Sequence, residues 1–228
     1  MYVNVETRRS GELPPYGHVD PFVAGVLVPD HPIVIVVHDE ADSQLHNPFE
    51  QALIAPILEV LADPRTYRLD PEHGLGVVVP HRAQRAALQE AVPGLAVADL
   101  ATGALTVSAV DTVERFQGGE REAILVSATE SDPDYVLASG AFLLDPRRLT
   151  VALSRARRKM NLVASRSVFS LFSTDEETVA HAQLWRTPRR RTCTVVLLWA
   201  RPRDGRHSEV WGNSSHQPSA ISSQPCGG

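Results

Sequence analysis

Lysine is almost absent from this sequence of 228 residues. Lys159 is the single lysine, so 21 of the 22 Lys and Arg residues are arginine. Arginine forms bidentate contacts with phosphate better than lysine does, so this bias is compatible with phosphate chemistry. The formal net charge is −5, which excludes a surface that is basic all over. Any nucleic-acid footprint must therefore be local.

Cysteine, aromatic residues and long apolar runs are also scarce. Cys193 and Cys226 alone cannot form a tetrahedral metal site, and a disulfide framework is not expected, which fits a reducing cytoplasm. Aromatic residues make up 6% of the chain, so aliphatic side chains must build most of the core. No apolar run reaches the roughly 18 residues that span a bilayer, and the residues after Met1 do not resemble a signal peptide. We therefore expect a soluble, cytoplasmic protein with no membrane partner.

β-branched and aliphatic runs alternate with helical patterns along the chain. The runs predict strands at 33–37, 76–79, 105–110, 123–128 and 161–164. Helices are predicted from the cap Asn47 to about Ala62, from Pro80 to beyond Leu88, and from the cap Asp145 through residue 158, whereas residues 129–145 are expected to form a polar loop. This alternation is typical of a three-layer α/β/α domain with a mainly parallel sheet.

Composition divides the chain into four parts. Residues 1–20 form an entry segment rich in Pro and Gly, and residues 21–173 form the core domain. Residues 174–213 form a small C-terminal extension, with a short helix at 175–186, a basic run at 189–191 and a hairpin made by 194–199 and 208–211. Ser, Gln, Pro and Gly dominate residues 214–228, which predicts a disordered tail.

A glycine pair stands between the third and fourth predicted strands, in the run Phe116-Gln117-Gly118-Gly119-Glu120. Glycine lets the backbone approach a ligand closely, because no Cβ intervenes. A purely structural turn needs the two glycines but neither the residues before them nor the acid after them. Both interpretations, a structural turn and a ligand-binding loop, are open at this point.

Two further segments carry arginine next to a predicted helix. Residues 80–85 (Pro-His-Arg-Ala-Gln-Arg) open a helix directly after a strand, where donors at the helix start attract anions. The alternative is an ordinary surface helix with solvated arginines. Residues 147–158 carry five arginines and no acid to pair with them. Such a cluster indicates an external anion, either nucleic acid or nucleotide phosphate, against the alternative of a solvated basic face.

The run His38-Asp39-Glu40-Ala41-Asp42 contains the letters of an acidic motif that holds Mg²⁺ through water. That motif works with an upstream phosphate loop of the form G-x-x-x-x-G-K-[ST], which the sequence lacks. His38 and Asp39 also suggest a metal-dependent phosphohydrolase, but no second His-Asp pair follows. We therefore expect an acidic, solvated strand exit here rather than a metal site.

Three of these segments, in this order, resemble the second RecA-like domain of superfamily 1 helicases. The similar subgroup includes the nonsense-mediated-decay RNA helicase and related bacterial AAA-type proteins. Residues 77–84 resemble its strand-P-Y-R-A-Q element, with His81 in place of tyrosine. Residues 112–120 resemble motif V, whose core is F-Q-G-x-E, and residues 146–157 resemble motif VI, with Thr150 in place of asparagine. The resemblance covers about residues 20–170.

The resemblance implies a role for several residues. Arg155 would be the arginine finger on the γ-phosphate of ATP, and Arg157 would either support it or pair with an acid. Glu120 would reach the sugar side of the nucleotide, in a loop shaped by Gln117 and Gly118. Residues implied to lie near the nucleic-acid backbone are His81, Arg82, Gln84 and Thr112. Asn47 and Glu50 also fit a family pattern ahead of the first core helix.

The resemblance further implies ATP and Mg²⁺, bound only together with a complementary first RecA-like domain in cis or in trans. We therefore expect the C-terminal motor domain of an ATP-dependent helicase or translocase that acts on single-stranded DNA or RNA. Because the phosphate loop is absent, we expect no ATP hydrolysis by the isolated chain. The alternative is a non-enzymatic, degenerate RecA-like module that binds nucleic acid or a partner protein.

Overall fold

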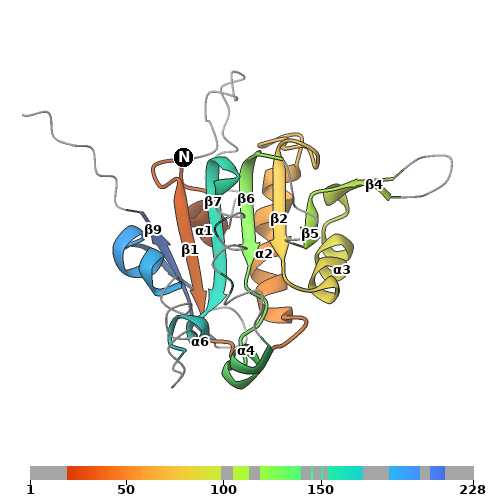
Figure 1. Ribbon diagram of the computed structural model, residues 1–228. Coiled ribbons are helices and arrows are strands. Elements are labelled where there is room, and N and C mark those ends of the chain that lie inside the picture. The colour runs from red at the N-terminus through yellow and green to blue at the C-terminus, as the bar shows by residue number, and fades with distance from the viewer. Residues whose placement is uncertain are drawn as a thin grey trace, which may run out of the picture.

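A seven-stranded sheet forms the centre of the molecule (Figure 1). The computed structural model describes residues 20–98, 105–112, 119–139, 145, 150, 154–171, 185–200 and 206–213. The strand order is β5-β2-β6-β7-β1-β9-β8. The first five strands are parallel, while β9 runs antiparallel to β1 and to β8. Strand bounds are β1 Ile33–His38, β2 Leu75–Val79, β5 Val110–Thr112, β6 Arg121–Ser127, β7 Ala156–Ser165, β8 Val195–Ala200 and β9 Ser208–Gly212. The predicted α/β fold with a mainly parallel, RecA-like sheet is confirmed.

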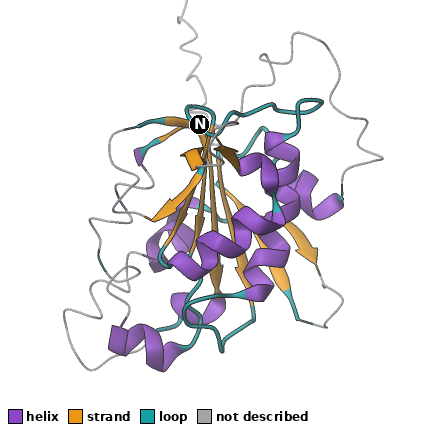
Figure 2. Ribbon diagram, turned by 90° about the vertical axis from the view of Figure 1, so that its right-hand side faces the viewer, coloured by secondary structure: helices purple, strands orange, loops and turns teal. Residues whose placement is uncertain are grey.

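Helices cover both faces of this sheet and complete three layers (Figures 1 and 2). One core cluster joins the sheet to α1, α2 and α3, and the other joins it to α4 and α6. The strands supply both clusters because alternate side chains point to opposite faces. In β1, for example, Val34 and Val36 belong to the first cluster, and Ile35 and Val37 belong to the second. Helix bounds are α1 Pro21–Val26, α2 Pro48–Ala62, α3 Arg82–Ala91, the 3₁₀ turn η2 Pro93–Leu95, α4 Pro133–Ser139, α6 Arg166–Phe169 and the π-turn η3 Pro188–Thr192.

Helix α2 begins as its sequence predicts. The side chain of Asn47 accepts a hydrogen bond from the backbone N–H of Glu50 at 2.9 Å, and Pro48 occupies the first helical position. This satisfies one of the helix's otherwise unpaired donors. The helix runs through Pro56 and ends at Ala62. Its fully buried stripe faces the first core cluster and consists of Ile54, Ile57, Leu58 and Leu61.

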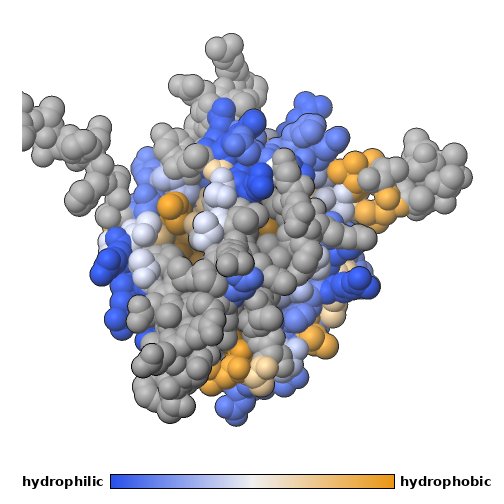
Figure 3. Space-filling model, viewed as in Figure 1, coloured by the Kyte–Doolittle hydropathy of each residue, from blue (hydrophilic) through white to orange (hydrophobic). Residues whose placement is uncertain are grey.

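The prediction of one continuous strand at 105–110 is wrong. It breaks at Ala109, whose backbone N–H donates to the carbonyl of Leu95 at 2.8 Å. Before the break, β4 Leu105–Ser108 pairs antiparallel with β3 Ala96–Ala98, outside the main sheet. After it, β5 joins β2. The β3–β4 hairpin projects beside β5, and its exposed apolar side chains contribute to an orange patch at the right of Figure 3.

Two more predictions need correction. Residues 129–145 are not a continuous loop, because α4 forms at 133–139 with the side chain of Asp132 accepting from the N–H groups of Asp134 and Tyr135. The helix predicted to reach residue 158 ends earlier, since β7 begins at Ala156. The backbone N–H of Arg121 donates to the carbonyl of Arg155 at 2.9 Å and continues the ladder with β6. Strand pairing therefore overrides the helical pattern here.

The predicted C-terminal hairpin is present as β8 and β9. It extends the main sheet, because β9 pairs with β1 from Val34 to His38. The predictions for Gln117, Gly118, the tail at 214–228, residues 1–19 and most of the helix at 175–186 lie outside the described residues. In the part of the chain that the structure describes, no helix is long and apolar enough to cross a membrane.

Candidate functional site

Two of the residues that the sequence assigns to a nucleotide site lie at the same end of the sheet, where the parallel strands begin. Glu120 immediately precedes β6, and Arg155 immediately precedes β7. These strands are parallel neighbours, with Arg121 paired to Ala156. The backbone hydrogen bond from Arg121 to Arg155 joins the first residue of β6 to the residue before β7. Glu120 of motif V and Arg155 of motif VI, which are about 35 residues apart in the sequence, therefore both lie where β6 and β7 begin.

Arginines at the start of β7 are paired with acids at the start of β6. Arg157 Nε donates to Glu120 Oε2 at 2.8 Å and its Nη1 lies 3.6 Å from Glu122, while Arg158 Nε forms an ion pair with Glu122 Oε2 at 2.6 Å. The inference that the arginines of 147–158 have no acid to pair with is therefore wrong for Arg157 and Arg158. The hydrogen bond to Glu120 raises the pKa of Arg157. The side chains of Arg157 and Glu120 are 58% and 57% exposed, so their pairing contributes little to stability.

Arg155 differs from these two arginines. Its Nε is buried and has no hydrogen-bond partner within the described residues. A buried donor without a partner is costly, and an anion that reached it would remove that cost through a charge-assisted hydrogen bond. Because the carbonyl of Arg155 is already bonded to Arg121, its backbone is fixed. The Nε of Arg155 is thus a buried donor without a partner among the described residues, on a backbone that is bonded to β6.

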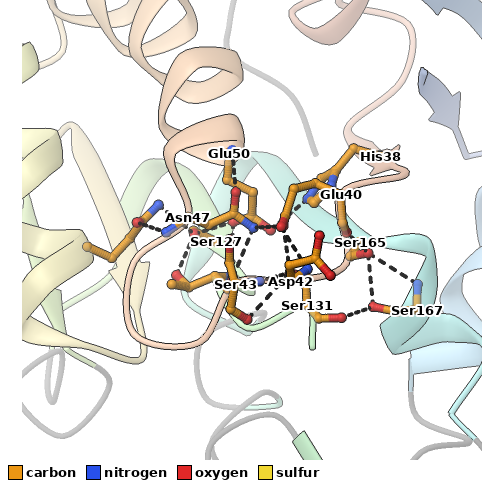
Figure 4. A network of polar contacts seen from close by, with 12 residues as sticks. His38, Glu40, Asp42, Ser43, Asn47, Glu50, Ser127, Ser131, Ser165 and Ser167 are labelled. Carbon is orange, nitrogen blue, oxygen red and sulfur yellow. Dashed lines mark hydrogen bonds and ion pairs between the residues drawn. The ribbon is translucent and has the colours of Figure 1, made fainter. Parts of the chain in front are cut away.

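A buried polar network lies at the opposite end of the sheet, at the carboxyl ends of the parallel strands (Figure 4). Glu50, on the first turn of α2, is its centre. One carboxylate oxygen accepts from His38 Nε2 at 3.0 Å. The other accepts from Ser127 Oγ at 2.5 Å and from the backbone N–H of Thr129 at 3.0 Å. The network therefore ties the ends of β1 and β6 to the start of α2.

Glu40 forms a second centre in the same network. Its carboxylate accepts from Asn47 Nδ2 at 2.7 Å, from Ser131 Oγ at 2.5 Å and from the backbone N–H of Asp42 at 2.8 Å. Burial raises the pKa of Glu40, but the hydrogen bonds from Ser131, Asp42 and Ser43 and the charge of His38 together outweigh it, so the pKa lies below the ordinary value. The expected acidic, solvated strand exit is wrong for His38 and Glu40, which are 0% and 4% exposed, whereas Asp39 and Asp42 are exposed as expected.

Asp39, the other acid considered for metal or phosphohydrolase chemistry, accepts from Arg166 Nε at 2.8 Å. The carboxylates of Asp39 and Glu40 are thus engaged with protein donors. In the ranges that the structure describes, no group of three or more His, Cys, Asp or Glu residues is arranged to hold a metal ion.

Thr129 adopts an unusual backbone conformation within this network. Its φ is 62°, in the left-handed region that a β-branched residue rarely adopts and that costs on the order of 1–3 kcal/mol. Three contacts hold it there. Its N–H donates to Glu50, its carbonyl accepts from Asn47 Nδ2 at 3.0 Å, and its hydroxyl meets Ser127 Oγ at 2.8 Å. Thr129 therefore depends on the polar network for its conformation.

The residues predicted to lie near nucleic acid are also found at the carboxyl ends of the strands, but in different environments. Thr112 ends β5 and is paired in register with the last residue of β2, which precedes the start of α3. Arg82 is exposed on the first turn of α3. His81 Nε2 lies 2.7 Å from Glu130 Oε1, and the Glu130 side chain is 1% exposed. One ring nitrogen of His81 is thus already in contact with a buried acid.

Gln84 is fully buried. Its side-chain oxygen accepts from the backbone N–H of Asn47 at 2.9 Å, and its nitrogen lies 3.5 Å from Ser127 Oγ. It therefore supports the network from within. The sequence carried one signal of this, because Gln84 and the buried Leu88 are four residues apart and share a helix face. The network's hydroxyl residues were not predicted; they are Ser127, Thr129, Ser131 and Ser165, all at or after strand ends.

A protein-family model described as "AAA domain" matches residues 28–167, which is more than half of the chain. The chain belongs to this family. Over 157 residues it is 29% identical to the DNA replication ATP-dependent helicase/nuclease JHS1 of Arabidopsis thaliana, covering 66% of this chain and 11% of that protein. Over 155 residues it is 32% identical to the DNA replication ATP-dependent helicase/nuclease DNA2 of Mus musculus, covering 67% and 14%.

A third relative is the DNA polymerase alpha-associated DNA helicase A of Saccharomyces cerevisiae. It is 31% identical over 127 residues, which is 56% of this chain and 17% of that protein. The family match and these relatives make the chain a superfamily 1 helicase-family domain. The matched region spans between 11% and 17% of the length of the three relatives.

Proposed function

We propose that this AAA domain is the second RecA-like lobe of an ATP-dependent nucleic-acid helicase or translocase. The observation that carries the proposal is the placement of Arg155 beside Glu120 at the starts of two neighbouring strands, with Arg155 Nε buried and without a partner in the described part of the chain. The names of the relatives support it, since all three are called helicases.

In this proposal Arg155 is the arginine finger. It stabilises the charge that develops on the γ-phosphate during hydrolysis, which in such enzymes is worth roughly 10³–10⁵ in rate, or about 4–7 kcal/mol. The backbone hydrogen bond to Arg121 holds the finger in position, so little ordering is needed when the nucleotide arrives. Glu120 accepts from a sugar hydroxyl, and Arg157 holds the Glu120 carboxylate in place. Gln117 and Gly118 complete the nucleotide loop.

The opposite end of the sheet, at the carboxyl ends of the parallel strands, forms part of the proposed nucleic-acid track, the surface along which a single strand lies. Arg82 and Thr112 offer a guanidinium and a hydroxyl to the backbone of a single strand, and His81 lies beside them, steadied by Glu130. Gln84 acts indirectly, by holding the backbone of Asn47 through the bond already described. Phosphate contacts of this kind position a strand and carry no base specificity.

The other half of the nucleotide site must come from a first RecA-like lobe, in cis or in trans. The single lysine cannot serve as a phosphate-loop lysine, because Lys159 is 1% exposed and its ammonium donates to the carbonyls of Val28 and His31 at 3.0 and 2.6 Å. Two of the acids considered for Mg²⁺, Asp39 and Glu40, are held by protein donors. Both the phosphate loop and the Mg²⁺ ligands therefore belong to the first lobe.

ATP turnover in the presence of single-stranded nucleic acid tests the proposal. The chain alone is expected to show only background turnover. Adding a first RecA-like lobe that carries a phosphate loop is expected to give turnover that Arg155→Ala abolishes and Arg65→Ala does not. Arg65 is the control because its exposed side chain pairs only with neighbouring Asp63. ATP turnover by the chain alone that Arg155→Ala removes would falsify the assignment of the phosphate loop and the Mg²⁺ ligands to a first lobe.

A second candidate is a non-enzymatic RecA-like module that binds nucleic acid or a partner protein. The contact that favours it is the Arg157–Glu120 pair, which occupies both side chains without a nucleotide. This candidate predicts strand binding that does not respond to an added first lobe or to a non-hydrolysable ATP analogue. A shift in strand affinity with both present favours the motor lobe.

A further inference from the structure

We propose that the turn η3 (Pro188–Thr192) and the strands β8 and β9 form a second surface that binds the phosphate backbone of a nucleic-acid strand. This surface lies beyond residues 28–167, which match the family model. The proposal rests on the proposed function, because it supposes that the chain engages nucleic acid at all. It adds a binding surface at the β8 end of the sheet, far along the strand order from Thr112 on β5.

Charge is distributed very unevenly along this chain. Residues 185–200 and 206–213 contain five arginines and one acid, so they carry a formal charge of +4 within a chain of net charge −5. The other 204 residues together carry −9. A basic segment on an otherwise acidic protein is the electrostatic footprint expected of a local polyanion site.

Arg189 anchors the turn to the sheet. Its guanidinium carbon lies 5.0 Å from the centre of the Trp211 ring, and its Nη2 lies 3.6 Å from Glu209 Oε2. Glu209 is only 4% exposed and also accepts from Arg166 at 2.6 Å and from the indole N–H of Trp211 at 2.8 Å. The buried acid of β9 is therefore fully engaged by Arg166, Arg189 and Trp211.

The next two arginines of the turn are left for an outside ligand. Arg190 and Arg191 are exposed, and no described residue forms a hydrogen bond or an ion pair with either side chain. Because Arg189 fixes the turn, the two guanidinium groups project from a backbone that is already ordered, which lowers the entropy cost of binding. Each can hold a phosphate through two parallel hydrogen bonds. Figure 1 shows this turn beside β9, at the end of the sheet opposite β5.

The surface offers charge rather than a stacking platform for bases. Arg189 covers the ring of Trp211, and Glu209 takes its N–H. Beside the turn, β8 presents the aliphatic side chains of Val195 and Val196, which are 38% and 40% exposed. Binding here should therefore depend on phosphates, be insensitive to base sequence and weaken steeply as salt rises.

The test is a salt titration of the binding of the full chain to a labelled 20-nucleotide single strand, as DNA and as RNA. Each phosphate contact on a single strand contributes about −0.7 to the slope of log affinity against log salt. Arg190→Ala/Arg191→Ala is expected to make the slope shallower by about 1.4. The control, Arg65→Gln/Arg68→Asn, removes two exposed arginines from the segment between α2 and β2 and is expected to keep the wild-type slope. Asparagine is chosen because Arg68 has φ 51°.

The same titration on Arg82→Ala separates this inference from the proposed function. A wild-type slope for the turn variant, with weakened binding by Arg82→Ala, overturns the second surface and keeps the proposed track. A shallower slope for the turn variant with no effect of Arg82→Ala supports the second surface and overturns the track. No binding by the wild-type chain overturns both. Equal displacement of the strand by polyglutamate of the same charge overturns the assignment to nucleic acid.

Discussion

Arg157 donates to Glu120 at 2.8 Å across the starts of two neighbouring strands, β7 and β6. The contact places an acid of motif V against an arginine of motif VI at the edge where Arg155 also lies. Both partners are more than half exposed, so a nucleotide can replace one of them at little cost. In the proposed function the pair positions Glu120 for the nucleotide, and its exposure means that it adds little to the stability of the fold.

Removing this pair should leave stability unchanged and impair nucleotide turnover. For Arg157→Ala and for Glu120→Gln we expect the wild-type urea midpoint, because exposed ion pairs add little to folding. We expect reduced ATP turnover when each variant is assayed with a first lobe. A lowered urea midpoint in both variants would show that the pair supports the fold instead.

Removing the carboxylate of Glu50 should have the opposite effect. Glu50→Gln replaces an oxygen that accepts hydrogen bonds with an amide nitrogen that cannot, and it leaves buried donors of His38 or of Ser127 and Thr129 without a partner. We expect a loss of about 2–4 kcal/mol in the free energy of unfolding, measured by urea denaturation. Glu59→Gln, an exposed position on the same helix, is the control. Equal stability of the two variants contradicts the structural role given to the network.

His81 should be needed chiefly because Glu130 is buried beside it. His81→Ala leaves the Glu130 carboxylate buried without its partner, which should lower the free energy of unfolding by about 2 kcal/mol. Replacing both residues, as His81→Ala/Glu130→Leu, should recover most of that loss, since the buried charge is then gone. If the double variant is no more stable than His81→Ala, the loss of stability in His81→Ala does not come from the unpaired Glu130 carboxylate.

Lys159 should make stability depend on pH. Burial lowers its pKa from 10.5 to about 7, so above pH 7 the folded chain binds fewer protons than the unfolded chain. Stability then rises with pH, by up to about 1.4 kcal/mol per unit, until the unfolded lysine also loses its proton. Burial raises the pKa of Cys193 from 9.0 to about 12, and this opposes the rise above pH 9.

The comparison that isolates this effect is wild type against Lys159→Met between pH 7 and pH 9. The gap between their free energies of unfolding should change in favour of wild type as pH rises, because only wild type carries the buried ammonium. Other titrating groups cancel in the difference. Parallel curves across this range would show that Lys159 has an ordinary pKa in the folded chain.

Local patterns in the sequence identify the buried strands and the start of α2. Uninterrupted aliphatic runs such as 33–37 suit strands buried on both faces, and Asn47 followed by Pro48 is a clear helix start. Strand pairing is not a local property, which explains the errors. Ala156 belongs to a strand because it pairs with Arg121, and nothing near it in the sequence shows this. The break at Ala109 similarly depends on the distant carbonyl of Leu95.

The candidate site was predictable in outline, and its charge pairing was not. The resemblance implied that Glu120 and Arg155 both lie near one nucleotide, and the structure places the strands that follow them side by side. The acids that pair with Arg157 and Arg158 come from about 35 residues earlier in the chain. The buried network escaped prediction for the same reason, since Glu50 and Ser127 are 77 residues apart.

The most direct test of the central claim is the steady-state ATP turnover of the chain joined by a first lobe, with and without Arg155. If Arg155 is the finger, Arg155→Ala lowers kcat by about 10³-fold or more, with a far smaller change in KM and an unchanged urea midpoint. Arg155→Lys keeps the charge, but it should recover little of the rate because it loses the two-point contact. A kcat for Arg155→Ala within tenfold of wild type would contradict the account.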